Sequence, residues 1–131
     1  MLTSYFARLK SIPENIIPIS ICGKCPDWYK GLEYKKLAPT YDIFIEYKNS
    51  GDEEKYTKRF KEEILSQLSV DVVLSELYEL AKSTEINFTD IVLICFEKSD
   101  AFCHRHLIAD WINDSELESC KEMVFEKKEG K

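Results

Sequence analysis

The sequence of 131 residues lacks the segments that identify membrane and secreted proteins. No run approaches the roughly 18 apolar residues that a membrane span requires, and the N-terminus has no apolar secretory core. An excess of basic residues is also missing, because 24 acidic residues outnumber 18 basic ones and give a net charge of −6. Phosphate neutralisation needs a basic face. The sequence therefore predicts a cytoplasmic protein with no membrane partner and no nonspecific nucleic-acid binding.

Several catalytic motifs are absent as well. The sequence has only four glycines and contains no G-x-G-x-x-G, no phosphate-binding P-loop and no G-x-S-x-G. A conventional dinucleotide enzyme, NTPase or serine hydrolase is therefore not expected, and no cofactor is predicted. The five cysteines form an odd, irregular set, whereas secreted disulfide scaffolds have an even and denser pattern. Reduced thiols are expected at Cys22, Cys25, Cys95, Cys103 and Cys120.

The length fits one domain over residues 1–131, with a charged tail from about residue 126 that is expected to fray. Strands are expected over 1–6, 16–22, 90–96 and 123–126, and amphipathic helices over 52–68 and 70–81. Residues 40–49 suit either a strand or a helix. The uninterrupted apolar run Ile91–Phe96 predicts a central strand covered on both faces, which is typical of parallel sheets. Pro18 indicates that its strand lies at an edge or begins near the proline. Together these features predict an α/β three-layer sandwich with a mainly parallel sheet.

Two chemically unusual segments follow predicted strands, and ligands of open parallel sheets bind beyond the carboxyl ends of the strands. In the first segment, residues 23–37, lysines alternate with aromatic residues in an otherwise acidic protein. One interpretation is a solvated loop whose aromatic side chains fix it to the body of the protein. The other is a loop that presents ammonium groups and aromatic faces to an anionic ligand containing a ring. The side chains concerned are Lys24, Lys30, Lys35, Lys36, Trp28, Tyr29 and Tyr34.

The second segment is Ile94–Ile112, where a helix is expected to begin with Ser99 or Asp100 as its N-cap. Helical spacing places His104 on the core face, as a buried histidine with one hydrogen-bond partner, and turns His106 toward solvent. Cys103 would lie in the first turn, where free amides and the helix dipole favour negative charge. Either the helix end and Arg105 hold an anion, or Cys103 is a nucleophile with a nearby histidine as base, or Cys103 is only a small buried apolar residue.

These residues carry a resemblance to a known family. L-I-C-F-E-K followed by C-H-R-H-L-I-A-D-W resembles the signature of domain-of-unknown-function family 488 (DUF488), and the segment I-C-G-K-C-P-D-W-Y-K-G-L-E-Y-K-K-L-A-P is similar to its branch of short bacterial and phage-type proteins. The resemblance implies a small Rossmann-like α/β fold. It supplies no activity. The family motif that it implies consists of Cys95, Glu97, Cys103, His104 and Arg105.

Cys22-Gly-Lys-Cys25 has the C-x-x-C spacing of a redox pair or of half a zinc site. Cys25 is not part of the family motif, which weighs against redox chemistry. A zinc set of Cys22 and Cys25 with Cys103 and His104 or His106 lacks a second tight cysteine pair. No metal site is therefore predicted.

The leading hypothesis is binding of a small anionic ligand, a nucleotide or nucleotide derivative, between the lysine and aromatic segment and the helix near Cys103. Arg105 and first-turn amides would bind phosphate, lysines would neutralise further charge, and Glu97 would fix a ribose hydroxyl or orient Arg105. Two alternatives remain open: a hydrolase or transferase that uses Cys103 with His104, or Glu97, and a phage-type protein that only sequesters a nucleotide signal. The predicted ligand-binding residues are Arg105, Lys24, Trp28, Tyr29, Lys30, Lys35, Lys36 and Cys95.

Overall fold

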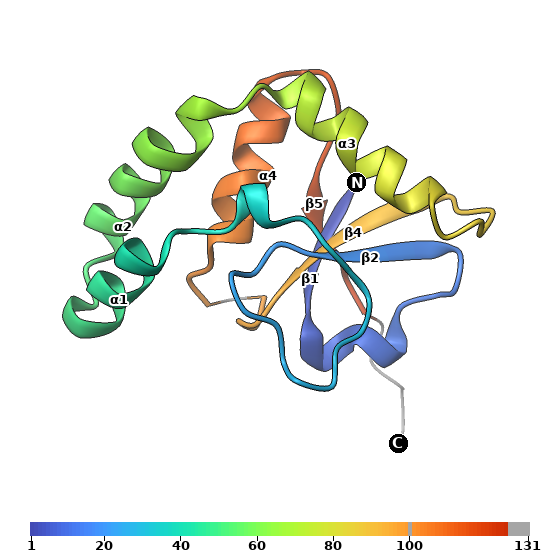
Figure 1. Cartoon of the computed structure of the whole chain (residues 1–131), viewed down its shortest axis with the longest axis horizontal. Coiled ribbons are helices and arrows are strands. Elements are labelled where there is room, and N and C mark those ends of the chain that lie inside the picture. Colours follow the sequence, from blue (N-terminus) through green and yellow to red (C-terminus); the bar gives the residue numbers. More distant parts are fainter. Residues whose placement is uncertain (100, 126–131) are drawn as a thin grey trace.

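The computed structural model describes residues 1–99 and 101–125, which form a five-stranded sheet in the order β3-β2-β4-β1-β5. All four strand pairings are parallel. The central strand β4 is buried from Ile91 to Cys95, as its continuous apolar run predicts. This arrangement confirms the α/β fold with a parallel sheet (Figure 1). The strands are β1 (Leu2–Tyr5), β2 (Ile16–Ser20), β3 (Leu32–Glu33), β4 (Asp90–Cys95) and β5 (Lys121–Glu122).

Helices cover the two faces of the sheet unequally. Helices α3 and α4 lie on one side, and the short 3-10 helix η1 lies on the other with the segment that follows β2 (Figure 1). The pair α1 and α2 extends beyond the carboxyl ends of the strands. The bounds are η1 (Phe6–Ser11), η2 (Lys35–Leu37), α1 (Tyr41–Ser50), α2 (Glu53–Arg59), η3 (Phe60–Ile64), η4 (Leu65–Gln67), α3 (Val70–Lys82) and α4 (His104–Asp114).

The segment that the sequence leaves open between strand and helix is helix α1. Thr40 caps its N-terminus, because the Thr40 hydroxyl accepts a hydrogen bond from the Ile43 amide at 3.4 Å. Gly51 ends it in the left-handed region, with φ of 68°, where a glycine is unstrained. Only Ile43 of this helix is fully buried, so the apolar residues that suggested a strand lie mainly on partly exposed surfaces.

Several predicted boundaries are wrong: β2 ends at Ser20, β4 ends at Cys95, and the helix predicted over 52–68 is α2 followed by η3 and η4. Helix α4 begins at His104 with Cys103 as its N-cap, four residues after Ser99, and Asp100 lies outside the described residues. The last strand is Lys121–Glu122, not 123–126, although the Met123 amide still donates to the Thr3 carbonyl at 2.8 Å. Residues 126–131, for which a frayed tail is predicted, also lie outside the described part.

Pro18 lies inside β2, which has a neighbour on each side. The outer neighbour β3 pairs only with Ile19 and Ser20, so the half of β2 that contains Pro18 is not paired with β3. The prediction of an edge therefore holds for that half of the strand only. No helix within the described residues is long and apolar enough to cross a membrane.

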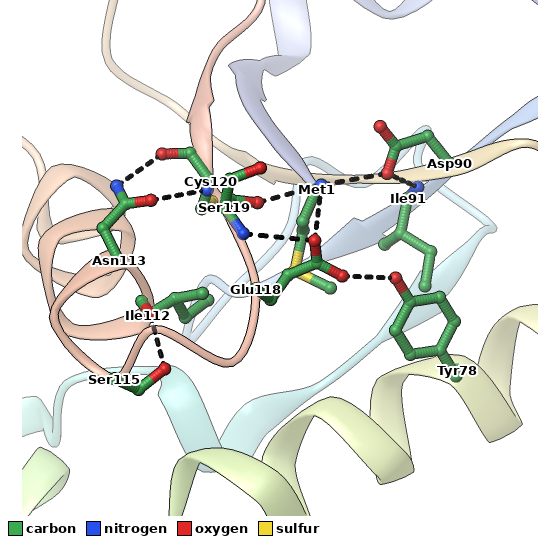
Figure 2. Close-up of polar contacts among 10 residues, drawn as sticks. All are labelled: Met1, Tyr78, Asp90, Ile91, Ile112, Asn113, Ser115, Glu118, Ser119 and Cys120. Carbon is green, nitrogen blue, oxygen red and sulfur yellow. Dashed lines mark hydrogen bonds and ion pairs between the residues drawn. The ribbon is translucent and has the colours of Figure 1, made fainter.

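The amino end of the sheet is fixed by the ammonium group of Met1. This group lies 3.1 Å from Asp90 Oδ1 and 3.9 Å from Glu118 Oε1, and it donates to the Ser119 carbonyl at 3.1 Å. Figure 2 shows these contacts together with the hydrogen bond of 2.8 Å from the Tyr78 hydroxyl to Glu118. The network joins the start of β1 to the segment that leads into β5, and thereby helps to position Glu122.

Candidate thiol site at the carboxyl end of the sheet

Two cysteines meet where β4 ends and α4 begins. Cys95 is the last residue of β4, Cys103 is the N-cap of α4, and both are buried. Their Sγ atoms are in bonding contact, while their Cα atoms lie 7.7 Å apart. The two residues are joined as a disulfide, so the prediction of reduced thiols is wrong for Cys95 and Cys103. Their Cα separation exceeds the roughly 4.4–6.8 Å of ordinary disulfides. The strand-turn-helix therefore brings together two sulfur atoms that are eight residues apart in the sequence.

His104 is held in one orientation beside Cys103. Its Nε2 lies 2.8 Å from the carbonyl oxygen of Ile21, and its Nδ1 lies 3.8 Å from the Cys103 Sγ. A carbonyl can only accept, so the ring proton is on Nε2 and the lone pair of Nδ1 faces the sulfur. Burial lowers the pKa of His104 to about 4, which keeps the ring neutral at neutral pH. The buried histidine with one hydrogen-bond partner is as the sequence predicts.

Arg105 is fully buried and paired with Glu122 of β5. Its Nε and Nη2 donate to the two carboxylate oxygens at 3.1 and 2.9 Å, and its Nη1 donates to the Cys95 Sγ at 3.0 Å. Burial would raise the pKa of Glu122, but hydrogen bonds from Arg105, Ser99 and Thr3 outweigh burial and hold this pKa below its usual value. An anion could bind Arg105 only if it displaced Glu122, so the geometry does not favour the predicted phosphate contact.

Among the described residues no hydrogen bond joins Glu97 to Arg105, and His106 lies elsewhere than the sequence indicates. Glu97 is exposed in the segment after β4, and the carboxylate that orients Arg105 is Glu122. His106 is half-buried instead of solvated. Its Nε2 is covered by the protein and has no hydrogen-bond partner among the described residues. The helix wheel misplaced His106 because the buried face of α4 extends over Arg105 and Ala109, beyond the stripe that the apolar residues define.

Aromatic side chains from α1, α2 and η3 form one wall of the site. The Phe60 ring lies 5.6 Å from the His104 ring, and Tyr56 lies 5.2 Å from Phe102. Tyr47 of α1 contacts Phe102 at the same centroid distance of 5.2 Å. The sequence predicted the segment with Tyr56 and Phe60 only as an amphipathic helix, without a role in the site. Its position over the carboxyl ends of the strands shows that this helix also shapes the surroundings of the thiol pair (Figure 1).

The lysine and aromatic segment lines a different hollow. A hollow of about 600 Å³ lies along β2, and Trp28, Tyr29 and Lys30 contribute to its wall together with Ile16, Ile17 and Pro18. Its lining includes neither Cys103 nor Arg105. Lys35 instead contacts Glu33 and the Gly23 carbonyl, and Lys36 contacts Glu76 of α3. Lys24 is exposed. The hollow that Trp28, Tyr29 and Lys30 line is therefore not shared with Cys103 or Arg105, and the joint ligand site of the two segments stays a prediction.

The C-x-x-C pair does not join the thiol site. Cys22 and Cys25 are both free, and the described residues 21–31 contain no helix such as a thioredoxin-like motif would open. Burial raises the pKa of Cys22 to about 12. The Cys25 Sγ lies 3.1 Å from the Ser20 hydroxyl and 3.2 Å from Glu33 Oε1. Among the described residues, the donor atoms that cluster within 4.8 Å of one another belong to Cys95, Cys103 and His104, not to the set weighed from the sequence.

The parallel sheet, the cysteine that ends its central strand and the Cys-His-Arg start of α4 define a small α/β protein with a thiol site at the carboxyl edge. The model of the family DUF488-N3a, described as the active DUF488-N3 subclade, matches residues 4–116, and the chain belongs to this family. Comparisons with curated proteins and with solved structures found no match.

Proposed function

We propose that the chain is a thiol-dependent hydrolase or transferase that acts on a small anionic, nucleotide-type substrate. The observation that supports this proposal best is the orientation of His104. Its Nε2 is occupied by the Ile21 carbonyl, and its unprotonated Nδ1 faces the Cys103 Sγ at 3.8 Å. A nucleophile beside a base that a third group orients is the usual arrangement in covalent catalysis. The family description as an active subclade agrees with a catalytic role.

In the proposed reaction, His104 Nδ1 accepts the thiol proton as the Cys103 sulfur attacks the electrophilic atom of the substrate. The bond to the leaving group breaks, and His104 returns the proton to that group. Water or a second acceptor then attacks the covalent intermediate and releases the Cys103 thiol. The first two amides of α4, of His104 and Arg105, precede the first bond of the helix, from the His106 amide to the Cys103 carbonyl, and point toward the same end, where they stabilise negative charge on the substrate. The reaction requires the Cys95–Cys103 disulfide to be reduced by a thiol first, and a reducing compartment such as the cytoplasm would supply that thiol.

Alkylation of the reduced protein tests the nucleophile. Cys103 is expected to react with iodoacetamide at least about tenfold faster than Cys25 near neutral pH, although Cys25 is the more exposed thiol. Iodoacetate should show a greater preference for Cys103 than iodoacetamide does, because the helix N-terminus attracts the anionic reagent. Peptide mapping by mass spectrometry measures both rates, and His104→Ala should remove the advantage.

Cys25→Ser is the matched control, since Cys25 lies outside the cluster and its loss should leave the labelling of Cys103 unchanged. Slower reaction of Cys103 than of Cys25 at every pH, with no change in His104→Ala, would contradict the proposal. It would leave Cys103 as a small buried residue.

A second candidate is ligand binding without turnover, favoured by the hollow along β2. Trp28 is 60% exposed, and with Tyr29 and Lys30 it offers aromatic faces and a positive charge to a base and a phosphate. This candidate keeps a nucleotide as the ligand but places its binding site at the hollow along β2 and not at Arg105. A phage-type sequestering protein would need such a site and no chemistry.

Calorimetric titration with nucleotides and ADP-ribose-type compounds tests the second candidate. Trp28→Ala is expected to weaken binding roughly tenfold or more through lost stacking. Tyr41→Ala, which removes another exposed aromatic side chain, on α1, is the control and should have no effect. Recovery of unchanged ligand after denaturation indicates sequestration, whereas an altered ligand indicates turnover. No heat of binding at millimolar ligand would exclude this candidate.

A further inference from the structure

We propose that the reduced cluster of Cys95, Cys103 and His104 binds one thiophilic divalent cation of the zinc class, and that the bound ion blocks the nucleophile. The second part rests on the proposed function. Once a thiol reductant has opened the Cys95–Cys103 disulfide, the three residues each offer one donor atom, two sulfurs and one ring nitrogen, and these atoms lie within 4.8 Å of one another. Zinc prefers tetrahedral sites of cysteine and histidine ligands, and three protein ligands leave a fourth position open for water or another small ligand.

The orientation of His104 fits a metal ligand. Histidines that bind metals usually donate the N–H of their second ring nitrogen to a carbonyl or carboxylate, which fixes the tautomer. Here Nε2 donates to the Ile21 carbonyl at 2.8 Å, and Nδ1, on the side of Cys103, is the nitrogen that keeps a lone pair. The ring is further held by Phe60 at a centroid distance of 5.6 Å. The ligand nitrogen is therefore positioned before any ion arrives.

The charges of the site also balance. Binding converts two thiols to thiolates with release of two protons, so the two negative charges neutralise the divalent ion. Arg105 already has its counter-ion in Glu122, at 2.9 Å, and adds no uncompensated charge. The Arg105 Nη1 donates to the Cys95 sulfur at 3.0 Å, a contact that suits a thiolate. The buried site thus accepts the ion without net charge, which a low-dielectric interior requires.

The ion and the covalent chemistry exclude each other. Both need the Cys103 sulfur and the His104 Nδ1, and a sulfur that is bound to zinc no longer has a thiol proton for the histidine to remove. A zinc-loaded chain is therefore inactive toward electrophiles until the ion leaves. The site would respond to the concentration of free zinc as well as to substrate.

Titration of the fully reduced chain with Co²⁺, followed by displacement with Zn²⁺, tests the site. The expected result is one ion per chain, a thiolate-to-cobalt charge-transfer band in the near ultraviolet, and release of about two protons measured in weak buffer. Cys103→Ser should weaken binding about a hundredfold or more, because ligand loss exceeds the effect of outer-shell changes. Serine is a preferred N-cap, so this variant keeps the start of α4. Cys120→Ser, a buried free cysteine outside the cluster, should bind as the unchanged protein does.

Absence of the charge-transfer band, or unchanged affinity in both Cys103→Ser and His104→Ala, would overturn the metal site. Zinc should also protect Cys103 from alkylation, and full labelling of a zinc-loaded chain would overturn the proposed block. Failure of the two proposals can be told apart. If cobalt binds but metal-free Cys103 reacts no faster than Cys25, the metal site stands and the nucleophile is wrong. Rapid alkylation of Cys103 without cobalt binding would support the nucleophile and overturn the metal site.

Discussion

Replacing Glu122 with leucine is expected to lower the free energy of unfolding by about 3–5 kcal/mol. The variant would leave the Arg105 guanidinium, which is fully buried, without the carboxylate that receives two of its hydrogen bonds. The remaining neighbours, the Cys95 sulfur at 3.0 Å and the Tyr5 ring at 5.6 Å, do not neutralise a full charge. Urea unfolding followed by circular dichroism measures the loss.

A double variant separates the pair from the packing around it. Arg105→Met combined with Glu122→Leu removes both charges together, and replacement of a buried ion pair by apolar residues is often close to neutral. We therefore expect the double variant to regain most of the lost stability. Glu79→Leu on α3 is the control, because the Glu79–Lys82 pair is exposed and should contribute less than about 0.5 kcal/mol. A Glu122→Leu protein as stable as the unchanged chain would show that Arg105 does not depend on Glu122.

Acidification is expected to reduce the free energy of unfolding by about 3 kcal/mol in total through His104 alone. Burial lowers the pKa of His104 from 6.5 to about 4 in the folded state. Between pH 6.5 and about 4, the unfolded chain therefore binds a proton at His104 that the folded chain does not bind. Stability therefore falls as the pH drops below about 6.5 and levels off near 4 for this group. Glu122 has a pKa below its ordinary value of 4.5, so its contribution is lost only at lower pH.

Urea unfolding at about pH 7.5 and about pH 5.5 measures this effect, where a loss of roughly 1 kcal/mol is expected from His104. His104→Gln keeps an N–H group near the Ile21 carbonyl but does not titrate. The variant should have a nearly flat dependence over the same range. Equal slopes in the two proteins would show that His104 is not buried as a neutral ring.

The parts of the fold that follow from local pattern were predicted correctly. The run Ile91–Phe96 predicted the central parallel strand, although Phe96 lies outside it and is exposed. The spacing of apolar residues predicted α2 and α3, although α2 ends at Arg59 and the chain continues to Gln67 as η3 and η4. The helix start was wrong because Ser99 is a good N-cap by chemistry, whereas the chain must first cross from β4 to the position where Cys103 meets Cys95. A capping preference contributes about 1 kcal/mol, which tertiary packing overrides.

The site could be predicted only in part, because its key partner is remote in the fold. Family resemblance indicated Cys95, Cys103, His104 and Arg105, which the structure does bring together. Glu122 was missed because its role depends on β1 lying between β4 and β5, an order that no local signal encodes. The only hint in the sequence was that the acidic residue Glu122 directly precedes the stretch 123–126, which was predicted as the last strand. The Trp28 segment was linked to α4 because both follow the carboxyl ends of strands, yet it folds along β2 instead.

The placement of Glu122 on the last described strand also affects the order in which the chain can assemble. Arg105 is synthesised before Glu122. One edge of β1 stays unpaired until residues 121–122 pair with Leu2 and Thr3. Until then the guanidinium has no buried counter-charge, so docking of α4 against the sheet is less favourable. The surroundings of the two cysteines are therefore complete only once residues 121–122 have paired with β1.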